Sequence, residues 1–170
     1  MKNKKGFTIV ELLVSMIVLA VFLAMSLSIG RASLQRAKFT DAFNGFIADF
    51  YYARQLAAVQ NKYVAFEFDP QGRFYSIRIQ KGFNVNLASE DSFIDHKTVN
   101  PLYGEAFFDV KQGGNFAFNP MGVVRAYPVD VGMNAISVRI EFFKKHETTG
   151  NIDYKKTVWI YPSGGIKIEK

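Results

Sequence analysis

Near its start the chain has one long apolar stretch. From Phe7 to Ile29 every residue is apolar or small, and Glu11 is the only charged residue. A helix of that length extends roughly 35 Å, enough to cross a hydrocarbon core of roughly 30 Å. A secretory signal peptide has a shorter apolar region followed by a small-residue cleavage site, and this stretch has neither feature. The pattern therefore predicts a membrane-spanning helix over residues 7–30.

The helical pattern continues beyond the apolar stretch. No proline occurs before Pro70, so one helix is predicted from Phe7 to Asn61, with Gly30 and Gly45 as the positions where it would soften. Its second half, residues 31–61, is amphipathic, with charged residues away from one apolar stripe. That stripe, which we expect to pack in a core, consists of Phe39, Phe43, Phe46, Phe50, Ala53 and Ala57.

After the helix, apolar residues recur at every second position. Residues 64–68 and 73–79 are two such runs, and Pro70-Gln71-Gly72 between them predicts a hairpin. Residues 80–104 lose the pattern and are expected to form a long polar loop. Further strands are predicted at residues 115–118, 123–127, 135–144, 154–161 and 166–168, with turns at residues 119–122, 150–151 and 162–165. These patterns predict an α+β head at residues 31–170, in which antiparallel sheets from residues 63–170 pack against the helix.

The polar loop raises the question of a metal site. Glu90, Asp91 and Asp95 cluster at residues 89–95, and carboxylates are the ligands that calcium prefers. The spacing matches no EF-hand loop, so a solvated loop is favoured over a calcium site, and no metal or cofactor is predicted.

The composition mainly excludes certain kinds of functional site. The 170 residues contain no cysteine, which excludes a disulfide framework, a thiolate zinc site and a cysteine nucleophile. The formal net charge is +6, but Lys2, Lys4 and Lys5 precede Gly6, and removing them would leave +3. The basic balance is therefore weak support for a polyanionic partner.

The residues around the start of the apolar stretch carry a specific motif. Lys4-Lys5-Gly6-Phe7-Thr8-Ile9-Val10-Glu11-Leu12-Leu13-Val14 resembles the processing site of type IV pilins and type II secretion pseudopilins. The resemblance implies that residues 1–6 are a leader. It implies that a prepilin peptidase cuts after Gly6 on the cytoplasmic face of the inner membrane and methylates the new amino terminus, Phe7. The head, residues 31–170, would then lie in the periplasm, and the chain would enter a filament with other pilin or pseudopilin subunits.

The chemistry of these residues agrees with such roles. Gly6 has no side chain, so a protease can approach the bond closely. A carboxylate inside a membrane span is costly unless it is paired or neutralised, which makes Glu11 a functional candidate. Glu11 of this or a neighbouring subunit could pair with the Phe7 amine, and that pairing would couple extraction from the membrane to assembly.

A second, looser resemblance covers most of the chain. Residues 50–54 with Ala57 and Asn61, then Phe118-Asn119-Pro120-Met121-Gly122, then a closing strand-Gly-Gly-strand, resemble the H-type minor pseudopilins and the FimT minor pilins. It implies a low-copy subunit near a filament tip. The first reading is a minor pseudopilin of type II secretion, which helps export folded cargo proteins. The alternative is a minor pilin of a type IV pilus, serving pilus assembly, motility or DNA uptake.

Nucleic-acid binding is the weakest of these implications. Some FimT-type pilins bind DNA through a C-terminal Gly-Arg-x-Arg motif, and the matching end here has Lys167 and Lys170 in place of arginines, with Glu169 between them. Two solvated lysines give weak, salt-sensitive contacts, so an ordinary edge strand is the favoured interpretation. Tyr51 and Tyr52 could stack bases, but their place on the helix favours packing.

Nothing in the sequence indicates an enzyme. His96 and His146 lie in polar segments without a second ligand at metal spacing. The chain has no Gly-x-Ser-x-Gly, no phosphate loop and no dinucleotide fingerprint. We therefore expect the function to depend on assembly and not on catalysis.

Replacing the residue before the expected cleavage site tests this interpretation. Gly6→Val should leave the precursor uncut, because a branched side chain blocks close approach of the peptidase to the bond. Immunoblotting of membranes would show a single band at the size of the uncut chain. A product shortened as in the wild type would refute the site.

Overall fold

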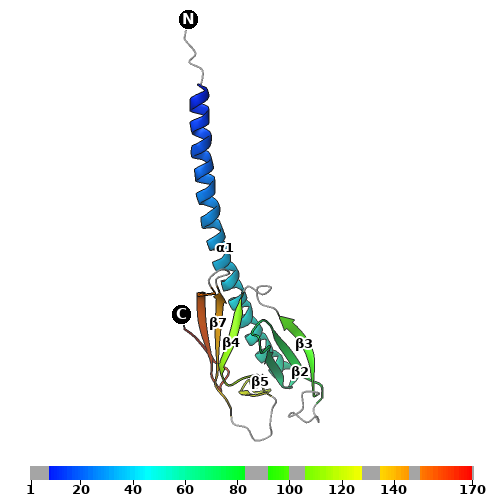
Figure 1. Ribbon diagram of the computed structural model, residues 1–170. Helices are drawn as coiled ribbons and strands as arrows, with labels where there is room; N and C mark the ends of the chain where they lie inside the picture. The colour runs from blue at the N-terminus through cyan, green and yellow to red at the C-terminus, as the bar shows by residue number, and fades with distance from the viewer. Residues whose placement is uncertain (1–7, 83–91, 100–105, 128–134, 146–149, 170) are drawn as a thin grey trace. The chain divides into compact units, whose positions relative to one another are not determined.

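The computed structural model describes residues 8–82, 92–99, 106–127, 135–145 and 150–169, and leaves aside the side chains of residues 26–32. The chain divides into two compact units, Met1–Lys38 and Phe39–Lys170. The elements in chain order (Figure 1) are α1 (Ile9–Gln60), β1 (Val64–Phe68), β2 (Tyr75–Gln80), β3 (Phe93–Val99), β4 (Phe107–Gln112), β5 (Phe116–Phe118), β6 (Val124–Ala126), β7 (Val138–Lys145), β8 (Ile152–Ile160) and β9 (Ile166–Glu169).

The predicted long helix is confirmed as α1, which continues through both Gly30 and Gly45. It ends where Asn61 takes a positive φ of 53° and the Lys62 N–H donates to the Ala57 carbonyl at 3.1 Å. This is a Schellman-type cap, for which asparagine is one of the few suitable residues besides glycine. The side chains that the structure describes on α1 are those of residues 9–25 and 33–60. Among the described residues, no helical stretch has the length and apolar content needed to cross a membrane.

The aromatic stripe on the second half of α1 is the centre of the core. All six residues of the predicted stripe are at most 3% exposed. Phe46 lies 4.8 Å from Phe142 of β7 and 5.4 Å from Tyr75 of β2 between ring centroids, so it contacts both sheets. Phe50 lies 4.9 Å from the ring of Phe118. The helix is therefore held by burial of one face against two sheets.

The strands form two antiparallel sheets, as the alternation of apolar residues predicted. The five-stranded sheet has the order β3-β2-β1-β5-β6 and the four-stranded sheet the order β4-β7-β8-β9. The predicted hairpin is β1 and β2, with Phe66 opposite Ile77 and both buried. The Phe108 N–H of β4 donates to the Gly72 carbonyl in the hairpin turn at 3.0 Å, which links the two sheets. The α+β class is confirmed.

One expectation was wrong. Residues 80–104 do not form one long loop, because Phe93–Val99 is a strand, β3, at the edge of the five-stranded sheet. Only Phe93 of that strand is buried, so its polar sequence gives no alternating signal. Strand β4 was also not predicted. Its inward residues Phe108 and Val110 do alternate with Asp109, but the adjacent Phe107 obscures the period.

Two glycine-containing turns close around a single arginine of α1. The Arg54 Nη1 and Nη2 groups donate to the carbonyls of Gly164 and Ser163 at 3.2 and 3.1 Å. Gly164 has a φ of +75°, and a Cβ there would lie 2.3 Å from the Gly122 carbonyl oxygen. The predicted turns at residues 119–122 and 162–165 thus meet on the helix, and only glycine fits at position 164.

A buried polar group ties α1 to strands β2 and β3. The Asp49 carboxylate, 9% exposed as a residue, accepts the Tyr75 hydroxyl at 2.8 Å and pairs with the Lys97 Nζ at 2.6 Å. Burial raises the pKa of Tyr75 well above its ordinary value of 10.0, and the charge and hydrogen bond of Asp49 add to the shift. The paired charge satisfies a carboxylate that would otherwise be costly at this depth.

The turn glycines can be tested against one another. Gly164→Ala should lower the free energy of unfolding by roughly 2–4 kcal/mol, because a positive φ and a backbone clash act together. Gly114→Ala is the matched control, since Gly114 has a φ of +64° with nothing within 4 Å of its added Cβ. It should cost only about 1 kcal/mol. Urea unfolding of the full chain in detergent, followed by circular dichroism, measures both; equal losses would refute the clash.

Tyr75 should give stability an alkaline limit. Because the folded protein keeps this phenol protonated above the pH at which the unfolded chain releases its proton, stability is lost as the pH rises beyond about 10. The free energy of unfolding of the wild type should fall with pH more steeply than that of Tyr75→Phe, by up to about 1.4 kcal/mol per pH unit. Urea midpoints between pH 9 and 11 measure the slope. Parallel slopes for the wild type and Tyr75→Phe would contradict the assignment.

Candidate functional site

The start of α1 is organised by Thr8 and Glu11. The Glu11 Oε2 atom accepts the backbone N–H of Thr8 and the Thr8 hydroxyl, both at 2.9 Å. In return, the Glu11 N–H donates to the Thr8 Oγ1 at 3.3 Å. This reciprocal arrangement is a capping box, in which the side chains satisfy backbone N–H groups that the first turn leaves without partners.

The capping box gives Glu11 a defined direction. Its carboxylate lies against the backbone N–H of Thr8, the residue that directly follows Phe7. Gly6 and Phe7, the predicted cleavage residue and new amino terminus, lie outside the described residues. Sequence reasoning identified Glu11 but missed Thr8, although Thr-x-x-Glu before an apolar run is the signature of this cap.

The helix around Glu11 presents apolar side chains outward over its whole circumference. The exposed fraction of the large apolar residues of α1 from Ile9 to Met25 ranges from 48% at Val18 to 85% at Ile9. Glu11 lies in one strip of this surface, which also contains Val10, Val14, Ser15, Val18, Leu19 and Phe22. A contiguous apolar surface of this extent requires lipid or other protein to cover it.

The C-terminal strand does not present two free lysines. The Lys167 Nζ pairs with the Glu169 carboxylate at 2.8 Å, and the same carboxylate accepts the Trp159 Nε1–H at 3.1 Å. Glu169 raises the pKa of Lys167 through this hydrogen bond and its charge. Lys170 lies outside the described residues. A phosphate approaching Lys167 would have to compete with a carboxylate already in place.

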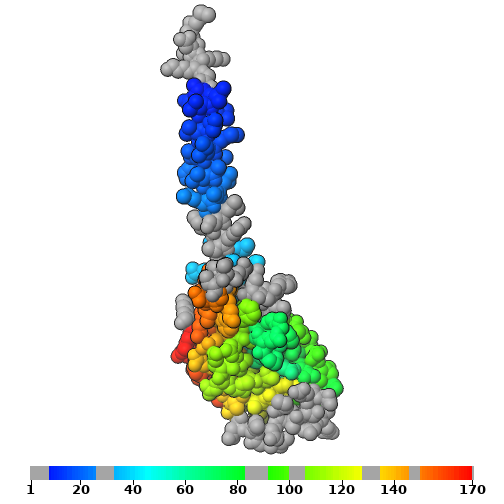
Figure 2. All heavy atoms as spheres, viewed as in Figure 1, coloured from blue at the N-terminus to red at the C-terminus, as the bar shows by residue number. Residues whose placement is uncertain are grey.

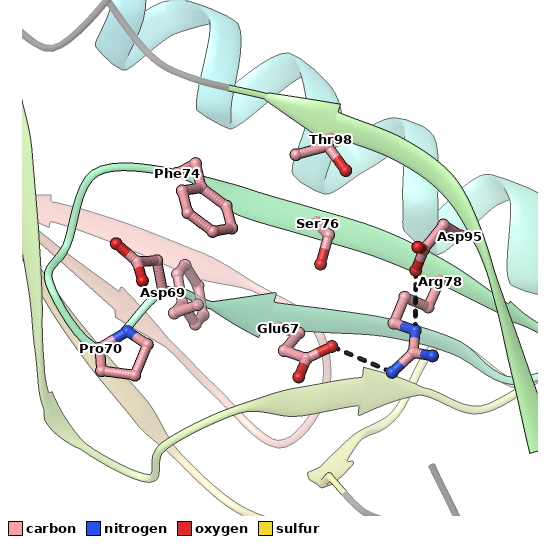
Figure 3. A pocket seen from close by; sticks show the side chains of 9 residues that line it. Glu67, Asp69, Pro70, Phe74, Ser76, Arg78, Asp95 and Thr98 are labelled. Atoms are coloured by element: carbon pink, nitrogen blue, oxygen red, sulfur yellow. Dashed lines mark hydrogen bonds and ion pairs between the residues drawn. The ribbon is translucent and has the colours of Figure 1, made fainter. Parts of the chain in front are cut away.

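Part of the acidic segment at residues 89–95 lines a pocket on the outer face of the five-stranded sheet (Figure 3). The pocket has a volume of about 360 Å³. The Arg78 guanidinium lies between two carboxylates, with Nη1 3.1 Å from Glu67 and Nε 3.0 Å from Asp95. Asp69 borders the pocket beside Phe74. Asp95 therefore forms an ion pair with Arg78, and its negative charge is already compensated within the protein.

Metal binding gains no support from this segment. Glu90 and Asp91 lie outside the described residues. Among the residues that are described, no three histidine, cysteine, aspartate or glutamate side chains form a group suited to a metal ion.

The histidine of β3 contacts the helix. Ile77 pairs with Lys97 and Arg78 with Asp95, so His96 is an extra residue in a β-bulge. The His96 ring stacks on Tyr52 with centroids 5.9 Å apart, and its Nε2 lies 2.9 Å from the Tyr52 hydroxyl. Tyr52 thus packs on β3 while 43% of it remains exposed. His146 lies outside the described residues.

Comparison with known sequences identifies a motif at the start of the chain. Residues 1–27 match the protein-family model described as the prokaryotic N-terminal methylation motif. No curated protein matches the chain in sequence.

Comparison with solved structures supports the fold over about three quarters of the chain. The minor pseudopilin EpsH from the type 2 secretion system of Vibrio cholerae aligns with a TM-score of 0.53 at 11% identity, over 76% of this chain and 94% of that one. The type IV minor pilin FimU of Pseudomonas aeruginosa aligns with a TM-score of 0.54 at 15% identity, over 79% of this chain and 90% of that one. A second crystal form of FimU gives 0.51 at 15% identity, over 77% and 92%.

The two kinds of comparison agree with the resemblance found in the sequence. The motif match covers the segment with Gly6, Phe7 and Glu11. The structural matches cover 76% and 79% of this chain, which has a long first helix and an antiparallel head. The chain therefore carries the N-terminal methylation motif of prokaryotic pilins on the fold shared by minor pseudopilins and minor pilins.

Proposed function

We propose that the chain is a filament subunit, anchored in the inner membrane until the first half of α1 packs against the same segment of other subunits. The observation that carries this proposal is the exposed apolar surface of α1 from Ile9 to Met25. As a sequence the stretch continues to Ile29, which gives it the length to span a bilayer. The head lies on the periplasmic side, and the function is assembly and not catalysis.

Processing precedes assembly in this proposal. A prepilin peptidase cleaves after Gly6 and methylates the amine of Phe7. The Glu11 carboxylate, already directed toward the Thr8 N–H, lies next to the residue that carries the new positive charge. In an apolar environment the two charges attract strongly, within one chain or between neighbours. The pairing sets the register between adjacent helices.

The first candidate machine is the type II secretion system. There the chain would be a minor pseudopilin near the tip of a short periplasmic filament that helps export folded proteins. The similarity of the head to EpsH supports this assignment.

The second candidate machine is a type IV pilus, favoured by the similarity to FimU. In that case the chain would be a minor pilin that supports pilus assembly, motility or DNA uptake. The pairing of Lys167 with Glu169 argues against nucleic-acid binding by the closing strand.

Two substitutions at Glu11 separate its charge from its capping role. Glu11→Ala should leave cleavage intact but reduce incorporation into filaments roughly tenfold or more, because the amine loses its partner in an apolar setting. Glu11→Gln keeps the capping box, since glutamine also serves at this position, but it removes the charge. Its incorporation, measured by immunoblotting sheared filaments, should fall as well. Incorporation of the glutamine variant at the wild-type level would contradict the ion-pair role.

A comparison of culture-medium proteins tests which machine the chain serves. If deletion of the gene makes a set of folded enzymes disappear from the medium and accumulate in the periplasm, the type II secretion assignment stands. An unchanged medium, together with fewer surface fibres or transformants, would favour the type IV pilus instead. Complementation with the wild-type gene and with Gly6→Val is the matched control.

A further inference from the structure

The outer face of the four-stranded sheet has an ordered arrangement of charges and rings. In an antiparallel sheet, residues directly opposite one another share a face, so the pairing gives its rows. Arg139, Trp159 and Lys167 form one row, and Phe107 and Phe143 belong to another. Between them lies an acidic row of Asp109, Glu141 and Glu169, with Thr157 among them. We call this surface the cationic–aromatic face; Figure 2 shows atoms of β4 in yellow-green and of the orange β7–β8 region at the viewed surface.

The rings of this face lie beneath basic groups. Phe107 and Phe143 stack with centroids 6.0 Å apart, and the Lys145 Nζ lies 5.8 and 5.7 Å from the two centroids. The Arg139 Cζ lies 5.1 Å from the centroid of Trp159. Such cation–π contacts fix the position of each basic group, and a neutral ring does not compensate its charge.

The carboxylates of the face do not balance its basic groups. Glu141 pairs with both Arg139 at 2.8 Å and Lys155 at 3.1 Å. Asp109 pairs with Lys111, and Glu169 with Lys167. Among the described residues, the Lys145 ammonium has no carboxylate partner and lies over the two rings. Asp153, exposed and two residues before Lys155 on β8, is the fourth carboxylate of this face, so its five described basic groups exceed the described carboxylates by one positive charge.

We propose that the cationic–aromatic face docks a carboxylate-bearing surface of a neighbouring subunit in the filament, a proposal that rests on the function proposed above. The excess charge complements an acidic protein surface, and tryptophan and arginine are the residues most enriched at interface hot spots. Base stacking is a poorer fit, because basic groups already lie over the rings that would stack. The neighbouring subunit is thus recognised by its acidic groups against Lys145 and Lys155.

Photo-cross-linking of the full chain in cells that assemble the filament tests this proposal. p-Benzoylphenylalanine replaces Phe143 on the cationic–aromatic face or, as a matched aromatic control, Phe74 at the pocket of the other sheet. Cross-linked products from sheared filaments are identified by mass spectrometry. We expect the Phe143 position, and not the Phe74 position, to link to a second protein that carries an N-terminal methylation motif.

Charge reversal then tests the recognition itself. Lys145→Glu combined with Lys155→Glu should lower the yield of that product about fivefold or more, since two attractive contacts with the acidic surface become repulsive. Lys81→Glu, at an exposed lysine next to β2, should leave the yield unchanged. A yield insensitive to the double reversal would overturn the role of the basic groups.

The remaining outcomes separate this proposal from the previous one. If the chain enters filaments but Phe143 yields no subunit adduct, or only nucleic-acid or lipid adducts, the docking face is overturned and the filament function stands. If the wild-type chain is absent from filaments altogether, both proposals fail. An immunoblot of the sheared filaments scores incorporation and cross-linking in one sample, so these outcomes are distinguished directly.

Discussion

Phe46 lies where the second half of α1 meets both sheets, and the rest of the head depends on burial at this point. Its ring contacts Phe66 and Tyr75 of one sheet and Phe142 of the other. An amphipathic helix with only one apolar stripe would normally pack on one sheet. Here phenylalanine is large enough to reach two, so a single row of side chains closes a core that neither sheet could close alone.

Polar contacts complete what this burial leaves undetermined. Apolar packing is nondirectional, so it does not by itself fix how the helix is rotated. The hydrogen bonds of Asp49 with Tyr75 and of Arg54 with Ser163 and Gly164 act at specific angles on either side of the aromatic stripe. They hold β2 and the last turn in one arrangement around the helix, and the ion pair of Asp49 with Lys97 adds β3.

Much of this fold follows from the sequence, since periods of 3.6 and 2 are local properties. The stripe from Phe39 to Ala57 and the β1–β2 hairpin were predicted from spacing alone. β3 escaped notice because an edge strand buried only at Phe93 carries no alternation. The hydrogen bonds of Arg54 with the last turn join residues more than a hundred positions apart, and no local pattern records such a contact.

The candidate site also has parts that the sequence predicts and parts that it does not. Glu11 was found because a charge in an apolar run is conspicuous, whereas Thr8 required attention to the first turn of the helix. The charged rows of the four-stranded sheet depend on the register between β7, β8 and β9, which a single sequence does not specify.

The position of Trp159 has an optical consequence. It is the only tryptophan in the chain, and it lies on the outer face of the sheet, while the core is built largely from phenylalanine. Its indole contacts Arg139 and donates to Glu169, so its emission reports the polarity of that surface. Intrinsic tryptophan fluorescence would therefore report binding or rearrangement at this face without a label. Loosened packing in the interior would change this emission little.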